Sequence, residues 1–157
     1  MHTAVRVGEL AALQWGDIEK NMIIINKTCN EFTREIVPSA KWQSNGKIEL
    51  NSLILKKLNH WKNLSNSYFI FPYVRNYQRA FSKQIAKIAK KNNIKSCSAH
   101  TLRHTSLTLL AIAGHATHEI QRVARHSSIN MTSKYIDSAK LTTLGILESV
   151  NKILNKC

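Results

Sequence analysis

The run Met22-Ile23-Ile24-Ile25 limits the possible folds more than any other stretch, because consecutive isoleucines favour a buried, extended strand. A strand needs partners, and the chain offers two. Residues Arg34 to Val37, with Pro38 at their end, predict a second strand, and the alternation in Lys47-Ile48-Glu49-Leu50 predicts a third. Asn45-Gly46 between these two is typical of a hairpin turn, since both residues tolerate positive φ. The sequence therefore predicts a three-stranded antiparallel sheet.

The remainder of the chain is predicted to be mainly helical, because only two prolines and five glycines interrupt its 157 residues. Apolar spacing predicts helices from Val7 to Trp15 (ended by Gly16), Ser52 (as N-cap) to about Lys62, Tyr77 to Lys91, Thr101 to Ala113, Thr117 (as N-cap) to about Ala124, Thr132 to Ile136 and Leu141 to Leu154. The expected buried faces hold Leu53, Leu55, Leu58 and Trp61 on the second helix, and Phe81, Ile85 and Ile88 on the third. The fold class is therefore α+β, a mainly helical domain with a small three-stranded antiparallel sheet.

The charge of the chain indicates the kind of partner that it binds. Lys and Arg number 23 against 9 Asp and Glu, which gives a formal net charge of +14. This excess repels itself within a compact protein and favours a polyanionic partner. Nucleic acid is the first candidate, an anionic membrane surface or an acidic protein is the second, and a plain solvated basic surface is the remaining alternative. The Lys-rich face of the predicted 77–91 helix is expected to touch phosphate backbone in part.

The cysteines and the hydropathy pattern favour a reduced, cytoplasmic setting. Cys29, Cys97 and Cys157 are odd in number and form no Cys-x-x-Cys motif, so the sequence supports neither a zinc knuckle nor a thiol-redox site. No stretch approaches the roughly 18 apolar residues that a membrane helix needs. The N-terminus shows no signal peptide pattern.

Three separate segments carry the side chains with chemical potential. His100 and Arg103 in Ala99-His100-Thr101-Leu102-Arg103-His104-Thr105 share one face of a starting helix, because three residues make nearly one turn. His126 follows in Arg125-His126-Ser127-Ser128-Ile129, and Tyr135 comes nine residues after His126. Arg6 lies far upstream, in Thr3-Ala4-Val5-Arg6-Val7-Gly8-Glu9-Leu10.

Together these residue types suit the cleavage of a phosphodiester without a metal ion. The planar fork of an arginine holds two phosphate oxygens and keeps its charge. Histidine donates a hydrogen bond or moves a proton near neutral pH. A deprotonated tyrosine is a nucleophile that forms a covalent intermediate, and a lysine can protonate the leaving 5′ oxygen.

In this order and spacing the segments resemble the tyrosine recombinase (phage integrase) family, from Thr3 to about Asp137. The first segment, followed by Leu13-Gln14-Trp15-Gly16-Asp17-Ile18, is similar to the family's first box. Arg6 matches the first catalytic arginine there, and Glu9 and Asp17 match supportive positions.

The second and third boxes of the family resemble the other two segments. His100 and Arg103 match the catalytic His and Arg, His126 matches the His/Trp position, and Tyr135 in Thr132-Ser133-Lys134-Tyr135 matches the nucleophile. The family's lysine lies by the hairpin turn of the small sheet, where Lys41 in Ser39-Ala40-Lys41 fits best and Lys47 and Lys27 are rivals. The resemblance thus implies the catalytic set Arg6, Lys41, His100, Arg103, His126 and Tyr135, with no cofactor and no metal.

Two residues depart from the family pattern, which usually has Gly in place of both Ala4 and Arg125. Neither position supplies a reacting group, so both changes are expected to be tolerated, and the charge of Arg125 is expected to help hold DNA. His104 and His115 are taken as structural. Only five residues precede Arg6, so residues 1–157 are expected to be a catalytic domain without the preceding helix and DNA-clasping domain of the family.

The resemblance implies a site-specific recombinase of double-stranded DNA that integrates or excises a mobile element through a 3′-phosphotyrosyl intermediate, as a tetramer on paired sites. Two alternatives stay open: a type IB topoisomerase-like relaxing enzyme, and a DNA-binding module that does not cleave. The C-terminal helix in 141–157 is expected to pack either on its own domain or on a neighbouring protomer.

Overall fold

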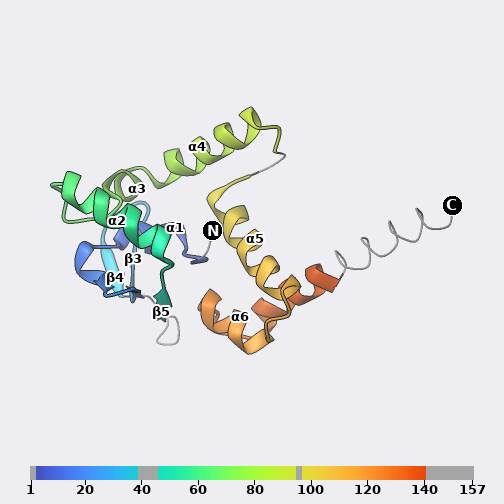
Figure 1. Ribbon diagram of the computed structural model, residues 1–157. Coiled ribbons are helices and arrows are strands. Elements are labelled where there is room, and N and C mark those ends of the chain that lie inside the picture. The colour runs from blue at the N-terminus through green and yellow to red at the C-terminus, as the bar shows by residue number, and fades with distance from the viewer. Residues whose placement is uncertain (1–2, 39–45, 95–96, 141–157) are drawn as a thin grey trace.

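The computed structural model describes residues 3–38, 46–94 and 97–140, and confirms the predicted class: a mainly helical chain with a small antiparallel sheet (Figure 1). The predicted segment Leu141 to Leu154 lies outside the described residues. The elements in chain order are α1 (Val7–Ala12), the 3₁₀ turn η1 (Trp15–Asp17), β1 (Ile18–Glu19), β2 (Met22–Ile25), β3 (Lys27–Cys29), β4 (Ile36–Pro38), β5 (Gly46–Glu49), α2 (Ser52–Leu64), α3 (Pro72–Asn76), α4 (Gln78–Lys91), α5 (Ala99–Ile112) and α6 (Thr117–Ala124), and a further helix spans 130–140.

The isoleucine-rich strand β2 is the centre of a three-stranded sheet with the order β1-β2-β5. Both neighbours are antiparallel, and β2 pairs with β5 in a register that places Ile23 opposite Ile48. Ile23 and Ile25 are buried, because alternate residues of the strand point toward one face. That face forms a core with apolar residues of the surrounding segments, namely Leu13, Leu50, Leu58 and Ile70.

The strand pairing differs from the prediction at one place. The predicted second strand, observed as β4, pairs with β3 in a separate two-stranded sheet and not with β5. The reason is that the chain forms a further strand, β3, directly after β2, and β3 takes β4 as its partner with Lys27 opposite Pro38 and Cys29 opposite Ile36. A hairpin between residues 34–37 and 47–50 is therefore wrong, and Asn45 of the expected turn lies outside the described residues.

Helix α2 is capped and packed differently from the pattern in its sequence. The N-cap is Asn51, not Ser52, since the Asn51 side chain accepts a hydrogen bond of 2.8 Å from the backbone N–H of Ile54. Leu58 is buried, but Leu53 is 61% exposed and Trp61 is 45% exposed. A single helix laid on a small sheet buries only the narrow stripe that faces the sheet, so half of the expected buried face contacts solvent.

The other helices differ less from their predicted ends, caps and buried faces. The first ends at Ala12, and a 3₁₀ turn continues to Asp17. On α4, Phe81 packs on the core formed by α1 and α3, whereas Ile88 near the end of the helix is exposed. The N-cap of α6 is Ala116 in place of the expected Thr117. None of the helices in the described part of the chain combines the length and apolar character needed to cross a bilayer.

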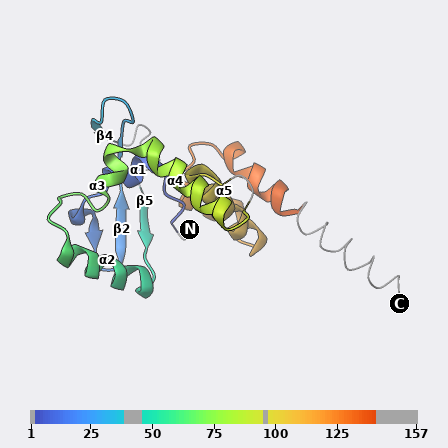
Figure 2. The ribbon, with the colours of Figure 1, turned by 90° about the horizontal axis from the view of Figure 1, so that it is seen from above.

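The molecule has two parts, which α4 and the N-terminal segment connect. The strands, α1, α2 and α3 form one part, which we call the strand lobe, while α5, α6 and helix 130–140 form the other, the helical lobe (Figures 1 and 2). The helical lobe has its own apolar core, and Ala4 of the N-terminal segment belongs to it together with Leu107, Ile120, Ala124 and Tyr135. Residues just before α1 therefore tie the two lobes together.

Candidate active site

Arg103 lies at the centre of the junction between the two lobes. It extends from α5, is only 4% exposed, and donates hydrogen bonds to the backbone carbonyls of Ala4 and Ala124. Burial lowers the pKa of Arg103 to about 10, and the positive charges of Arg6 and Arg125 add to this effect. The guanidinium is still charged at neutral pH, so the junction holds a permanent cation.

Arg6 is the more accessible cation of the junction. It occupies the N-cap position of α1, where its backbone N–H donates to Glu9 Oε2 and its Nη1 donates to Glu9 Oε1, both at 2.8 Å. Its Nη2 donates to the carbonyl of Arg125 at 3.3 Å. The side chain remains 39% exposed, and a bound anion can therefore reach it.

Glu9 is the buried anion that balances these cations. Burial by itself would raise the pKa of the Glu9 carboxyl, but hydrogen bonding to Arg125, its charge and the bonds from Arg6 hold the pKa below its usual value. Glu9 is therefore ionised at neutral pH. The supportive position that the resemblance implied for Glu9 corresponds here to a buried carboxylate between two guanidinium groups.

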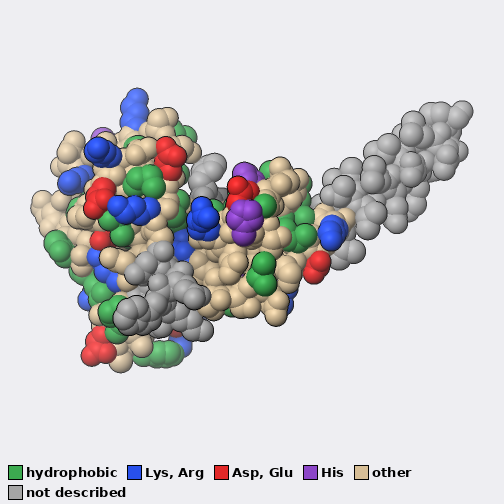
Figure 3. Space-filling model, turned by 90° about the horizontal axis from the view of Figure 1, so that it is seen from below, with side chains coloured by type: hydrophobic (Ala, Val, Ile, Leu, Met, Phe, Trp, Pro, Cys, Tyr) green, Lys and Arg blue, Asp and Glu red, His purple; other side chains and the backbone are tan. Residues whose placement is uncertain are grey.

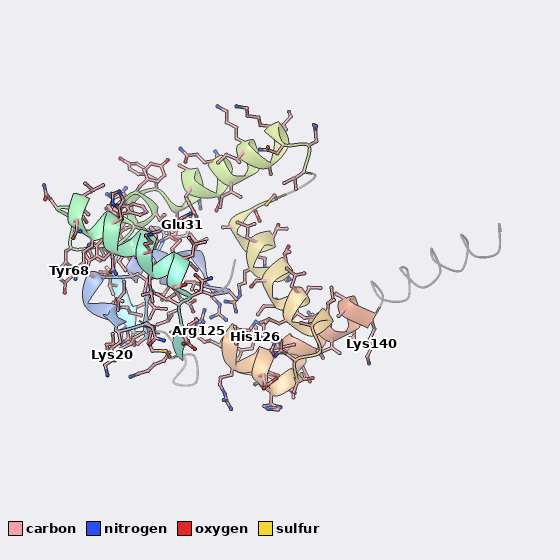
Figure 4. All side chains as sticks on the ribbon, viewed as in Figure 1. Lys20, Glu31, Tyr68, Arg125, His126 and Lys140 are labelled. Carbon is pink, nitrogen blue, oxygen red and sulfur yellow. The ribbon has the colours of Figure 1, made fainter. Side chains whose placement is uncertain are left out.

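Arg125 lies inside the protein and not on a DNA-facing surface. Its side chain is buried, pairs with Glu9 at 2.7 Å and points from the end of α6 toward β5 (Figure 4). The expectation that Arg125 helps to hold DNA directly is therefore wrong. The residue is 2% exposed, and its guanidinium donates to Glu9 and to the carbonyls of Val123 and Ala4, so it lies out of reach of a phosphate at the surface.

Tyr135, on helix 130–140, lies between two imidazole rings. The His126 ring stacks on it with 5.9 Å between centroids, and the His104 ring lies 5.2 Å away. Burial raises the pKa of the phenol, while the charges of Arg103 and Arg6 act in the opposite direction. The phenol is consequently neutral at rest, and its activation requires removal of the proton in the presence of the two arginines.

His126 is held as a neutral imidazole. It is buried beside Tyr135, and its Nδ1 lies 3.0 Å from the hydroxyl of Thr132. Burial lowers the pKa of His126 to about 4, assisted by the charges of Arg103, Arg6, Arg125 and His104. At neutral pH this imidazole can donate one hydrogen bond but carries no charge.

His100 reaches the tyrosine through a second histidine. Its Nε2 lies 2.7 Å from Nε2 of His104, one turn later on α5, so at least one of the two rings is neutral. Burial lowers the pKa of His104, and the charges of His100, Arg103 and Lys134 contribute in the same direction. His104 was predicted to be structural, but it lies between His100 and the ring of Tyr135.

Two contacts of the cluster were missed at the sequence level. The i,i+4 spacing of His100 and His104 was a usable signal, because such residues are neighbours on a helix. Thr132 gave no signal of its own, since its partner His126 is brought to it by the turn before helix 130–140.

The structure thus brings five of the six predicted site residues to one junction: Arg6, His100, Arg103, His126 and Tyr135. Lys41 lies outside the described residues. Of its rivals, Lys27 is half-buried and bound to Asp17 at 2.6 Å, while Lys47 is exposed and paired with Glu19 at 3.2 Å. Among the described residues, no group of three or more His, Cys, Asp or Glu side chains is arranged to hold a metal ion.

A tyrosine beside two imidazoles and two arginines thus lies on a mainly helical body with a small antiparallel sheet, and that fold is also found in solved integrase and recombinase structures. The sequence model of the phage integrase family matches residues 1–141, and the chain belongs to that family. The ICEBs1 integrase of Bacillus subtilis (strain 168) is 28% identical over 148 residues, which are 83% of this chain and 40% of that protein.

Solved structures share the fold. The Tn1549 transposon integrase in complex with a circular intermediate DNA superposes with a TM-score of 0.74 at 21% identity, over 91% of this chain and 55% of that one. XerA recombinase superposes with a TM-score of 0.70 at 24% identity, over 90% of this chain and 53% of that one. A lambda integrase dimer bound to a core site superposes with a TM-score of 0.58 at 19% identity, over 86% of this chain and 39% of that one. The chain thus spans about half the length of these proteins, or less.

Proposed function

We propose that the chain is the catalytic part of a site-specific DNA recombinase, and that Tyr135 is its nucleophile. The observation that carries the proposal is the position of Tyr135, between the rings of His104 and His126 and within the electrostatic reach of Arg6 and Arg103. Two arginines and two imidazoles beside one phenol form a site that suits a polyanion. A DNA phosphate carries the negative charge that Arg6 and Arg103 attract.

The chemical step follows from the groups at the junction. The phenol oxygen of Tyr135 attacks the scissile phosphorus and forms a 3′-phosphotyrosyl bond, while the bond from phosphorus to the 5′ oxygen breaks. His100, acting beside His104, takes the phenolic proton. The family resemblance, and not the described part of the structure, assigns Lys41 to protonate the leaving 5′ oxygen. A 5′ hydroxyl then attacks the phosphotyrosine and reverses the step, so no external energy source is needed.

The arginines and His126 act on the phosphate itself. Arg6 and Arg103 neutralise the non-bridging oxygens, on which negative charge grows in the transition state. The neutral His126 donates a hydrogen bond to the same group. Lys and Arg side chains lie on both lobes in the face drawn in Figure 3, and Lys83, Lys87 and Lys90 are exposed on α4. These charges add contacts to the DNA backbone that are independent of base sequence.

We further propose that this activity integrates or excises a mobile element, with protomers assembled as a tetramer on paired sites. Its support is that the chain resembles an integrase named for the element ICEBs1 and shares the fold of an integrase named for the transposon Tn1549.

A nicked duplex that loses a short fragment after cleavage tests the function, because the covalent adduct is then trapped. The full chain should form a protein–DNA adduct, and Tyr135→Phe should form none. Tyr68→Phe is the matched control, since Tyr68 is 68% exposed in the strand lobe, and this variant should react like the wild type. DNA binding without any adduct would support the non-cleaving module instead, and relaxation of supercoiled DNA without strand exchange would support the topoisomerase-like alternative.

A further inference from the structure

The two residues that stand where the family usually has glycine are in contact with each other. Ala4 has φ 44° and Arg125 has φ 54°, so both adopt the left-handed conformation that glycine tolerates best. Nη2 of Arg125 donates to the Ala4 carbonyl at 3.3 Å. The backbone shape that glycine would normally allow is thus kept at both places, and a side-chain bond joins them.

Arg125 uses its guanidinium entirely inside the protein. Nη2 and Nε bind the two oxygens of Glu9 at 2.7 and 3.4 Å, and Nη1 donates to the carbonyl of Val123 at 2.9 Å. Its stem packs against β5, where a Cβ on Gly46 would lie 3.2 Å from Cδ of Arg125. Because the residue is 2% exposed, it acts on a bound phosphate only through its neighbours.

Those neighbours are the two arginines of the proposed clamp. Arg6 shares Glu9 with Arg125 and also donates to the Arg125 carbonyl. Arg103 shares the Ala4 carbonyl with Arg125 and binds the carbonyl of Ala124, the residue just before it. Each clamp arginine therefore rests on groups that Arg125 also holds.

We propose that Arg125 is a positioning residue: by sharing Glu9 and the Ala4 carbonyl, it sets the places of Arg6 and Arg103 for the scissile phosphate. The proposal rests on the function proposed above. With Arg125 present, one carboxylate is divided between two cations. Without it, Glu9 has Arg6 as its remaining side-chain partner in this cluster, and binds Arg6 in competition with the phosphate.

The variant Arg125→Gly removes the guanidinium and also relieves the left-handed strain. We expect cleavage of the nicked duplex to slow by about 10- to 100-fold, as displaced catalytic groups do, while DNA affinity falls by no more than about threefold, as one lost charge away from the DNA predicts. The control is Arg122→Ala, which removes an exposed arginine from the same helix. Arg122→Ala should lose as much DNA affinity as Arg125→Gly and keep the wild-type cleavage rate.

A double-variant comparison separates positioning from a general structural effect. Arg6→Ala should weaken DNA binding and cleavage more in the wild type than in Arg125→Gly, because residues that depend on each other show non-additive effects. The binding arm requires no cleavage, so it stays informative if the wild type forms no adduct and the proposed function fails. Equal effects of Arg6→Ala in both backgrounds would overturn the positioning role.

The variant Arg125→Lys keeps a cation but lacks the fork that holds Glu9 and the carbonyls together. It should cleave slowly, and it replaces Arg125→Gly if thermal unfolding shows that the glycine variant does not fold. Wild-type cleavage by either variant would overturn the proposal.

Discussion

The core of the strand lobe and the junction around Arg103 are both buried, but they are built from opposite kinds of side chain. The first consists of apolar residues such as Ile23, Ile25 and Leu58, packed under a small sheet. The second contains Glu9, Arg103 and Arg125, each no more than 4% exposed. Apolar packing tolerates changes of similar volume, whereas buried charges tolerate almost none once a partner is lost.

The junction around Arg103 depends on exact geometry more than the apolar core does. In the part of the chain that the structure describes, every buried side-chain nitrogen and oxygen has a hydrogen-bond partner. At the junction these partners come from segments far apart in sequence, for example Ala4 and Ala124, which Arg103 joins. The apolar core stabilises the lobe, and the junction places cations at defined positions.

The largest effect is expected when the junction loses its central cation. Arg103→Met should lower the free energy of unfolding by about 3–5 kcal/mol, since it leaves buried partners unpaired, and should reduce cleavage by at least about 10²-fold. Urea denaturation and adduct formation measure the two effects. The matched change in the strand lobe, Ile25→Val, should cost about 1 kcal/mol and leave cleavage nearly unchanged. A similar loss of cleavage in both variants would remove the distinction between the regions.

A smaller effect is expected from pH. The pKa of His126 is lowered to about 4 from a usual value of 6.5, so the unfolded state binds the proton first as pH falls. Stability should therefore decrease from about pH 6.5 to about pH 4, by up to about 3 kcal/mol, and His126 adds no further decrease below that. Glu9, whose pKa is lowered, adds a loss of stability that begins near its usual value of 4.5 and continues as pH falls through its folded pKa.

His126→Gln isolates the histidine contribution to this pH dependence. Thermal unfolding between pH 4 and 7 should show a flatter profile in the variant than in the wild type. His60→Gln in the strand lobe, an exposed histidine of α2, should keep the wild-type slope. An unchanged slope in His126→Gln would show that His126 is not held neutral.

The smallest effect is expected on the outer side of α2. Leu53→Ala should change the free energy of unfolding by less than about 0.5 kcal/mol, because the side chain is 61% exposed. Leu58→Ala, on the buried side of the same helix, should cost about 2–5 kcal/mol. Urea denaturation distinguishes the two, and equal costs would mean that the outer side is covered in solution.

The elements and candidate residues were largely predictable, while their partners were not. β2, β5 and the helices α2, α4, α5 and α6 follow from local patterns, and so did the identity of Arg6, Arg103 and Tyr135 as candidates. The pairing of β4 with β3 was missed because the short strand β3 was not predicted, and a strand of three residues forms only when a distant partner lies beside it. The burial of Arg125 was missed because an arginine in sequence gives no sign of a distant Glu9.

By itself the sequence determined the class of fold, the basic charge and the order of the candidate residues, because strand propensity, helical spacing and residue chemistry are local properties. Only the tertiary structure decided which groups share a proton, a carboxylate or a carbonyl. It placed His104 against Tyr135 and turned Arg125 inward onto Glu9. The contact of Arg125 with Glu9 joins residues more than a hundred positions apart, and it exists only when the two lobes come together around Arg103.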